Sequence, residues 1–484
     1  MGGEIVAGDR SQVFGDVSID TRTLNAGDLF VAIRGERFDG AAFAAAAIDA
    51  GAAGVVVPRG WARRADDVSS APGLAEGSGG STAARSAGGG GKALAGRAAV
   101  VIEVDDTTVA LQRLAHSIRR ESGTKVVAIT GSAGKTTTKE VTSELLAVRY
   151  RVIRNRGNFN NHIGLPLSLI ELRQRPEIAV VELGMNHAGE VSTLVRVAEP
   201  DVRVWTNVGE AHVGFFASVD AIADAKAEIL EGATASTLLV ANADDDRIAA
   251  RLRAFRGRVV TFGMDRPADV HASAIVDRGI DGTSARVTTP GGSVDVVTPL
   301  LGRANLANIL AATAVALEFG IPLPVVVEKA AHLRPAAHRG EIVRLPGGVT
   351  IIDDSYNANP TATKRALEVL ASSRASRRVA VLGEMLELGD RSAGLHADVG
   401  RAAAAANVDV LLAVGGPPAS ALADAAVTAG MPKASVRYFA TSDEAAAAAA
   451  ALVKAGDVVL VKGSRGVKTD RVVERLEGGG AERG

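Results

Sequence analysis

The residues with the clearest chemical meaning form a short loop, Gly131-Ser132-Ala133-Gly134-Lys135-Thr136-Thr137. An apolar run precedes the loop and a helix-like stretch follows it, which is the strand–loop–helix setting of a phosphate-binding loop. Glycines let backbone N–H groups point at phosphate oxygens, and a helix N-terminus adds partial positive charge. We expect Lys135 to neutralise the β- and γ-phosphates and the Thr136 hydroxyl to bind Mg²⁺. The loop therefore predicts binding of ATP or GTP together with magnesium.

The loop departs from the full phosphate-loop motif at one position. Ile129 stands where that motif has a glycine, so the sequence is a shorter Gly-x-x-Gly-Lys-Thr variant. The alternative interpretation is a glycine-rich turn with an incidental lysine. The flanking strand and helix patterns favour the phosphate loop.

Composition narrows the class of protein. A chain of 484 residues is too long for one hydrophobic core, so several domains are expected. With 47% hydrophobic residues, 23% charged residues and a net charge of −1, nothing favours binding to nucleic acid or to a membrane surface. The absence of cysteine excludes disulfides, zinc–thiolate sites and cysteine nucleophiles. No signal-peptide pattern or membrane-spanning apolar run is found, and we expect a cytoplasmic protein.

The order of apolar runs and helical stretches predicts an α/β protein with three domains. Residues 1–108 form a small α/β domain that contains a Gly-, Ser- and Ala-rich surface insertion at 60–98. Residues 109–334 form the phosphate-loop domain, whose strands are apolar on both faces and therefore belong to a covered parallel sheet. A few antiparallel strands are expected around 265–298. Residues 335–484 repeat the alternation and predict a Rossmann-like domain.

Two further residues follow apolar strands of the central domain. Glu182 ends the run at 178–183, so its carboxylate is expected at the C-terminal edge of the sheet, beside the phosphate loop. A carboxylate oxygen is a suitable ligand for Mg²⁺. His212 comes after the run at 202–208 and is expected at the same edge. From the residues alone, both could equally be ordinary surface side chains.

The loop and several other segments resemble the Mur ligases and folylpolyglutamate synthases, which are ATP-dependent enzymes that join a carboxylate to an amine. The matching segments occur in the family's order over nearly the whole chain: 130–137, 158–161, 164–166, 182–184, 207–212, Lys226, Asn305, 338–339, 353–360 and 462–465. Three segments, 353–360, 382–389 and 462–465, look most like the members that add D-alanyl-D-alanine to UDP-N-acetylmuramoyl-tripeptide. The Asp-Asn-Pro-Arg signature typical of the ligases that add the preceding residue is not found.

The resemblance implies a catalytic and metal-binding set. Catalysis would depend on Lys135, Lys226, His212 and Arg339, while Mg²⁺ would be held by Thr136, Glu182, His212 and Lys226. In this family the lysine that matches Lys226 is carbamylated, which converts a cation into an anionic metal ligand. Without the resemblance, Lys226 would be interpreted as a solvated helix lysine.

The resemblance also implies how the nucleotide is held. Asn305 would contact the adenine, Arg339 would reach the γ-phosphate, and Asp354 would hold the ribose. Alternatives remain for each residue: Asn305 could begin a helix, Arg339 could form an interdomain salt bridge, and Asp353 could replace Asp354 if the register is shifted by one.

The remaining implied residues would bind the two other substrates. Those for the UDP-muramoyl tripeptide are Thr21, Arg22, Asn158, Asn160 and Asn161, with the segment 34–40 also near the diphosphate. Those for D-alanyl-D-alanine are Asn357, Asn359, Lys462, Ser464 and Arg465. The asparagines could alternatively serve as turn residues.

The loop predicts an enzyme that depends on a nucleotide and Mg²⁺, and the resemblance implies an ATP-dependent ligase of peptidoglycan synthesis that works through an acyl phosphate. We expect it to act as a monomer. One alternative is a ligase of another step or of the folylpolyglutamate type. A second is a phosphate-loop switch protein, but the Asn-Lys-x-Asp run typical of guanine recognition is not found, and the last 150 or so residues would have no role.

Overall fold

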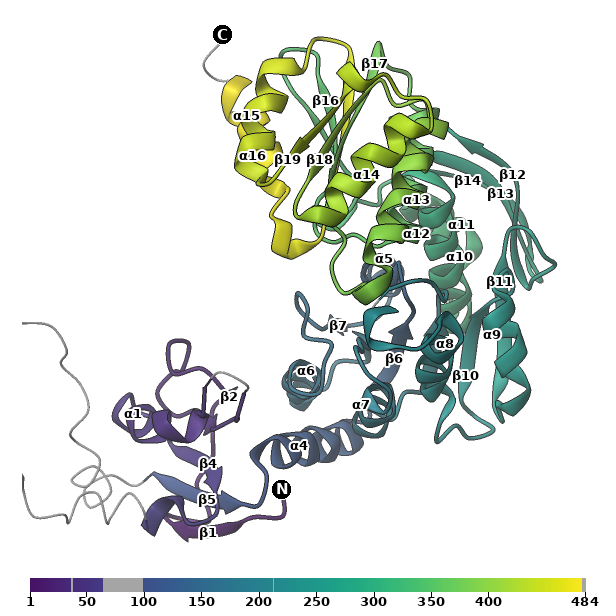
Figure 1. Cartoon of the computed structure of the whole chain (residues 1–484). Coiled ribbons are helices and arrows are strands. Elements are labelled where there is room, and N and C mark those ends of the chain that lie inside the picture. The colour runs from purple at the N-terminus through teal and green to yellow at the C-terminus, as the bar shows by residue number, and fades with distance from the viewer. Residues whose placement is uncertain (36–37, 64–98, 212, 481–484) are drawn as a thin grey trace, which may run out of the picture. The chain divides into compact units, whose positions relative to one another are not determined.

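The computed structural model describes residues 1–35, 38–63, 99–211 and 213–480 and separates into two compact units (Figure 1). The first unit comprises Met1–Gly123 and Arg156–Arg175, and the second comprises Thr124–Asn155 and Pro176–Gly484. Three sheets with covering helices confirm the predicted α/β class. Most of the predicted insertion, Glu36, Arg37 and the predicted metal ligand His212 lie outside the described residues. Within the described residues, no helix is both long and apolar enough to cross a bilayer.

The first unit contains a five-stranded sheet with the order β1-β5-β4-β3-β2, in which only β1 runs antiparallel to its neighbour. Its strands are β1 (Glu4–Ala7), β2 (Val17–Ser18), β3 (Leu29–Val31), β4 (Gly54–Pro58) and β5 (Val100–Val104). Helix α1 (Ala44–Asp49) covers the sheet, and its Ile48 packs in a small core with Phe30, Val55 and Trp61. The short apolar runs of the sequence therefore form a compact domain around one apolar face.

Helix α4 (Thr107–Ser122) begins where the Asp106 carboxylate accepts a hydrogen bond from the Val109 N–H, and it ends at Gly123 in a left-handed conformation. These are the usual signals for the start and the end of a helix. The domain boundary that we placed after residue 108 falls inside this helix. Helix α4 packs against α6 (Gly164–Ile170), which belongs to a segment that leaves the second unit after Asn155 and returns at Pro176.

The second unit contains a nine-stranded sheet with the order β14-β13-β12-β11-β10-β9-β6-β8-β7. Its strands are β6 (Lys125–Thr130), β7 (Val152–Arg154), β8 (Ile178–Glu182), β9 (Val202–Trp205), β10 (Leu238–Asn242), β11 (Arg258–Gly263), β12 (Val270–Asp277), β13 (Thr283–Thr289) and β14 (Gly292–Thr298). The strands from β7 to β12 are parallel, whereas β12, β13 and β14 pair antiparallel, as expected for this region. Strand β6, which leads into the phosphate loop, lies between β8 and β9.

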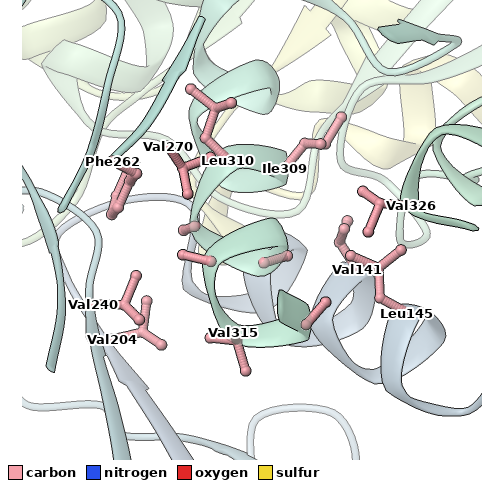
Figure 2. Close-up of a cluster of buried hydrophobic side chains, with 14 of the residues drawn as sticks. Val141, Leu145, Val204, Val240, Phe262, Val270, Ile309, Leu310, Val315 and Val326 are labelled. Carbon is pink, nitrogen blue, oxygen red and sulfur yellow. The ribbon is translucent and has the colours of Figure 1, made fainter. Parts of the chain in front are cut away.

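The helices of this part of the second unit are α5 (Lys135–Leu146), α7 (Glu190–Ala198), α8 (Val219–Ala227), α9 (Asp246–Arg251), α10 (Gly302–Glu318) and α11 (Leu323–Ala330). Helix α10 is apolar on nearly all sides, which is the pattern of a buried helix. Figure 2 shows Leu310 of α10 near Val270 of the sheet, while Val141 and Leu145 of α5 lie on the other side of α10. The core therefore fixes α5, and with it the phosphate loop, against the sheet.

The last part of the second unit contains a six-stranded sheet with the order β15-β16-β20-β17-β18-β19. Its elements are β15 (Glu341–Arg344), β16 (Thr350–Asp354), α12 (Pro360–Ser372), β17 (Arg377–Gly383), α13 (Ser392–Ala405), β18 (Val410–Val414), α14 (Pro417–Thr428), β19 (Val436–Phe439), α15 (Ser442–Leu452), β20 (Asp457–Lys462) and α16 (Asp470–Gly480). Helices α12, α13 and α14 pack side by side, and α15 pairs with α16 (Figure 1). Strand β20 lies between β16 and β17, so the chain reverses its direction of winding there.

Candidate active site

The phosphate loop runs from the end of β6 to the start of α5 and depends on two glycines. Gly131 and Gly134 both have positive φ angles, 152° and 80°, which side chains rarely adopt. A Cβ atom at Gly131 would lie 1.9 Å from the Thr206 Oγ1, and one at Gly134 would lie 2.3 Å from the Asn308 Oδ1. Both positions therefore require glycine, because the loop passes close to the neighbouring strand β9 and to helix α10.

The start of helix α5 places Lys135 and Thr136 at the loop. The Lys135 ammonium donates a hydrogen bond to the Gly131 carbonyl at 2.8 Å. Burial lowers the pKa of this ammonium, the Glu182 carboxylate opposes that shift, and the positive charge of Arg339 adds to it. The Thr136 hydroxyl donates to the Glu182 carboxylate at 2.7 Å. The sequence correctly predicted that Glu182 and the loop share one edge of the sheet.

Glu182 is the last residue of β8 and is only 4% exposed. Its position follows from the parallel pairing of β6 and β8, in which Ile129 is opposite Glu182. The Asn155 side chain accepts a hydrogen bond from the Glu182 N–H at 3.0 Å and so fixes the end of the strand. Asn155 was not predicted from the sequence, because its one signal there is its place between an apolar run and an asparagine-rich segment.

Lys226 lies on α8 and is 1% exposed, so the interpretation as a solvated helix lysine is wrong. Burial lowers the pKa of Lys226 well below its usual value; the charge of Lys135 acts in the same direction and that of Glu182 opposes it. The charges of Lys135 and Glu182 thus act on Lys226, which indicates that the three side chains belong to one site. In the part of the chain that the structure describes, no group of three or more His, Asp or Glu side chains could hold a metal ion.

Asn305 and Asn308 connect α10 to the phosphate loop. The Asn305 side chain donates to the Leu301 carbonyl at 3.0 Å, and it accepts from the Asn308 amide at 3.3 Å. Asn308 is buried, and its Oδ1 accepts a hydrogen bond from the Thr138 hydroxyl of α5 at 3.2 Å. The sequence identified Asn305 through the resemblance and missed Asn308, which lies one helical turn further along the same face.

Asp354 and Lys462 meet at the C-terminal ends of β16 and β20, which pair in parallel. The Lys462 ammonium donates to the Asp354 carboxylate at 2.6 Å and to the Asn357 carbonyl at 2.9 Å. Burial raises the pKa of Asp354, while the charges of Lys462 and Arg339 lower it. Asn359 has a different role in the fold, because its side chain accepts from the Ala362 N–H at 2.8 Å and caps helix α12.

Arg339 lies over the ring of Tyr356 at 4.1 Å, and Arg465 approaches the same ring at 5.4 Å. Two guanidinium groups are therefore gathered by one aromatic side chain through cation–π contacts. Ser464, next to Arg465, accepts a hydrogen bond from the Leu386 N–H at 2.9 Å and joins β20 to the segment after β17. Tyr356 lies in the resembling segment 353–360, but the sequence did not predict its place between the two arginines.

His338 has a φ angle of 59°, and its imidazole pairs with the buried Asp353 carboxylate at 2.7 Å. Ser355 also donates to Asp353 through both its N–H and its hydroxyl. Asp353 thus anchors the connection into the last sheet, while Asp354 faces Lys462. The hydrogen bond to Asp353 raises the pKa of His338, although partial burial opposes it.

The His338–Asp353 pair should make folding stability depend on pH. Because the pKa of His338 is raised above 6.5, the pair contributes fully below pH 6.5 and its contribution is lost as the pH rises through the folded-state pKa. We expect His338→Gln to lower the free energy of unfolding more at pH 5.5 than at pH 9, measured by urea unfolding. An equal loss at both pH values would show that the pair does not titrate in this range.

The remaining predicted residues lie in the first unit. Thr21 is half-buried, and the neighbouring exposed Arg22 pairs with Asp20 at 2.6 Å, which lowers the pKa of that carboxyl to about 2. The Asn161 side chain accepts from the Gly164 N–H at 2.8 Å at the start of α6, and the Asn160 N–H donates to the Asn158 carbonyl at 2.7 Å.

A surface pocket of about 600 Å³ also lies in the first unit. It is lined by Arg34, Asp39, Ala41, Ala42, Pro58, Arg59, Trp61 and Asp105. Arg34 and Asp39 belong to the segment 34–40, which the resemblance places near a diphosphate. The pocket combines two arginines and two aspartates with an aromatic ring, and Arg59 is paired with Asp105.

Comparison with known proteins places this geometry in a family. Residues 14–119 match the Mur ligase family catalytic domain, residues 129–316 the Mur ligase middle domain, and residues 338–465 the Mur ligase glutamate ligase domain. A UDP-N-acetylmuramoyl-tripeptide–D-alanyl-D-alanine ligase from Bacillus subtilis is 34% identical and covers 95% of this chain and 92% of its own length. The enzyme of that name from Escherichia coli is 33% identical and covers 96% and 94%.

Solved structures agree with the sequence relatives. A crystal structure of MurF from Acinetobacter baumannii matches with a TM-score of 0.81 at 31% identity, covering 96% of this chain and 93% of that one. The MurF ligase from Thermotoga maritima in complex with ADP matches with a TM-score of 0.81 at 27% identity, covering 98% and 100%. With matching domains in the same order and relatives aligned over nearly its full length, the chain belongs to the Mur ligase family and is most like MurF.

Proposed function

We propose that the chain joins D-alanyl-D-alanine to UDP-N-acetylmuramoyl-tripeptide with conversion of ATP to ADP and phosphate, in the cytoplasmic stage of peptidoglycan synthesis. The observation that carries the proposal is the cluster at the phosphate loop, where Thr136 bonds Glu182 and Lys135 is within electrostatic reach of Glu182, Lys226 and Arg339. The relatives that match along nearly the whole chain bear the name of this ligase. We further propose that it acts as a monomer.

The nucleotide is assigned to the loop residues from Gly131 to Thr137, and Lys135 neutralises its β- and γ-phosphates. Asn305 is assigned to the adenine, Asp354 to the ribose and Arg339 to the γ-phosphate. The planar guanidinium of Arg339 suits a phosphoryl group, and its stacking on Tyr356 restricts its orientation. These assignments require residues at the last sheet and at the phosphate loop to bind the same nucleotide. The positive charge of Arg339 lowers the pKa of Lys135, which supports this requirement.

The residues around Glu182 fit Mg²⁺. Its carboxylate and the Thr136 hydroxyl offer two oxygen atoms 2.7 Å apart, and Mg²⁺ prefers oxygen ligands and keeps several waters, so a site with few protein ligands is expected. We assign Thr136, Glu182, His212 and Lys226 to the metal, Lys226 in carbamylated form. Bound there, Mg²⁺ would neutralise charge on the transferring phosphoryl group.

The chemistry begins with the terminal carboxylate of the tripeptide, which is a poor electrophile. A carboxylate oxygen attacks the γ-phosphorus of ATP, the bond to the β-phosphate oxygen breaks, and ADP and an acyl phosphate form. The amine of D-alanyl-D-alanine then attacks the acyl carbon, loses a proton and expels phosphate. Lys135 and Arg339 act by positioning the phosphoryl group and neutralising charge, and closure of the site would exclude water from the acyl phosphate.

The other substrates are assigned by domain. Residues 1–108, with Thr21 and Arg22, hold the UDP-muramoyl end, and the pocket beside Arg34 and Arg59 offers cationic groups for a diphosphate. Residues 109–334 carry the nucleotide, and residues 335–484 hold the dipeptide. The substrate residues proposed outside the first domain are Asn158, Asn160 and Asn161 on the path to the carboxylate, and Asn357, Asn359, Lys462, Ser464 and Arg465 for the dipeptide.

The test measures phosphate release by the purified protein with MgATP and UDP-N-acetylmuramoyl-tripeptide. We expect release to require D-alanyl-D-alanine and the product to be the pentapeptide, identified by its mass. Single amino acids, including glutamate and diaminopimelate, serve as controls. Stimulation by a single amino acid but not by the dipeptide would assign the chain to another ligation step, and nucleotide hydrolysis independent of both acceptors would favour the switch-protein alternative.

A further inference from the structure

The segment after β9 forms hydrogen bonds with the phosphate loop. Strands β6 and β9 are parallel, with Thr130 opposite Trp205, and their pairing continues past the strand ends. The Thr206 N–H donates to the Thr130 carbonyl and the Ser132 N–H donates to the Asn207 carbonyl, each at 3.0 Å. The first part of the loop is therefore held as an extension of the sheet.

The Asn207 side chain completes this attachment. Its Oδ1 accepts from the Ala133 N–H at 2.9 Å, and its Nδ2 donates to the Ala133 carbonyl at 3.0 Å. Both backbone groups of Ala133 are thus bound by one amide, in the only orientation that satisfies both partners. Ser132 is held as well, because its hydroxyl accepts from the Gly209 N–H at 2.8 Å.

These bonds decide which loop groups remain for a ligand. The N–H groups of Ser132 and Ala133 are used inside the protein. The groups that remain begin at Gly134 and continue through the first turn of α5, whose N–H groups have no partner within a helix. A cluster of such N–H groups at a helix N-terminus is an anion site. The set of N–H groups that can bind phosphate is therefore small, and its position depends on how the Ser132–Ala133 turn is held.

We propose that Asn207 is a positioning residue for nucleotide binding: it holds the shortened phosphate loop so that the N–H groups from Gly134 to Thr137 converge on the phosphates. This rests on the proposed nucleotide site. Asn207 itself is fixed from the next strand, since the Asn242 amide donates to the Thr206 carbonyl at 2.9 Å and the Asp245 carboxylate accepts from the Val208 N–H at 2.7 Å.

The test compares Asn207→Ala with wild type by calorimetric titration of MgADP and by steady-state kinetics. Loss of two hydrogen bonds that shape the loop is expected to weaken MgADP binding and raise the KM for ATP by about tenfold or more. The KM for the tripeptide and for the dipeptide should change by less than about twofold. Asn207→Leu keeps the branched shape of the side chain, loses both hydrogen bonds to Ala133 and adds no charge beside the phosphates, so it should weaken MgADP binding too, even if the alanine variant does not fold.

Gln112→Ala is the matched control, because it removes an exposed amide hydrogen bond, to the His162 carbonyl at 3.0 Å, that lies within the first unit. An equal loss of MgADP affinity in Asn207→Leu and Gln112→Ala would mean that Asn207 is only structural, and MgADP binding of Asn207→Leu within about twofold of wild type would overturn the proposal. Lys135→Ala distinguishes a failure of the proposed nucleotide site from a failure of the role proposed for Asn207. If it binds MgADP like wild type, the nucleotide site itself is misplaced; if it alone loses affinity, only the role of Asn207 fails.

Discussion

Replacing Lys135 with alanine is expected to lower the ligation rate by about 10³-fold or more, because phosphoryl transfer relies on charge neutralisation at the phosphates. Lys135 is the loop residue whose ammonium lies within electrostatic reach of both Glu182 and Arg339. Neither neighbour can substitute for it: Glu182 is negative, and Arg339 lies on the last sheet. The measurement is single-turnover formation of the acyl phosphate, trapped by reduction, alongside steady-state phosphate release.

The control for this variant is Lys125→Ala. Lys125 lies at the other end of the same strand, is exposed and pairs with Asp201 at 2.8 Å, so its loss removes a lysine from β6 without changing the loop. We expect Lys125→Ala to keep nearly full activity. Lys135→Ala should keep the fold, since the hydrogen bond that its ammonium makes in the described part of the chain goes to the Gly131 carbonyl of the same loop. Ligation by Lys135→Ala at a rate near that of wild type would contradict the mechanism.

Much of this site could be predicted from the sequence, because the residues of the phosphate loop are close together along the chain. The strand, loop and helix around Lys135 are contiguous, and Glu182 was placed beside them by one rule, that the C-terminal ends of parallel strands share an edge. The pairing of Ile129 with Glu182 agrees with that expectation. Antiparallel pairing after Val270 was likewise visible as a change in composition and is confirmed.

The contacts that the sequence could not give join residues far apart along the chain. Asn308 accepts a hydrogen bond from Thr138, which lies 170 positions earlier in the chain and directly after the loop. No pattern in either segment predicts this contact. The same holds for Tyr356, which gathers Arg339 and Arg465. The segment 156–175 belongs to the first unit although it interrupts the second, because its helix α6 packs on α4. Burial of Lys226 was also hidden, since a lysine in a helix with acidic neighbours has the composition of an exposed face.

The burial of Lys226 underlies the second prediction, a large loss of ligation rate. Replacing Lys226 with glutamine is expected to lower the ligation rate by about 100-fold or more, because the site would lose the proposed carbamate, an anionic group that would balance Mg²⁺ and Lys135. A carbamate forms when an uncharged amine attacks CO₂ and releases a proton. Burial, and the charge of Lys135 after it, lower the pKa of Lys226 well below its usual value, so a larger fraction of this amine is uncharged at a given pH than in an exposed lysine.

The modification itself can be measured by carbon NMR after equilibration with ¹³C-labelled CO₂. Wild type should show a carbamate resonance that disappears in Lys226→Gln and remains in Lys329→Gln, a control at an exposed lysine of α11. The resonance and the activity should be lost together, because an unmodified Lys226 adds a buried amine whose charge acts on Lys135, whereas the carbamate would add a negative charge to that of Glu182. A fully active Lys226→Gln variant, or a resonance that persists in it, would contradict this account.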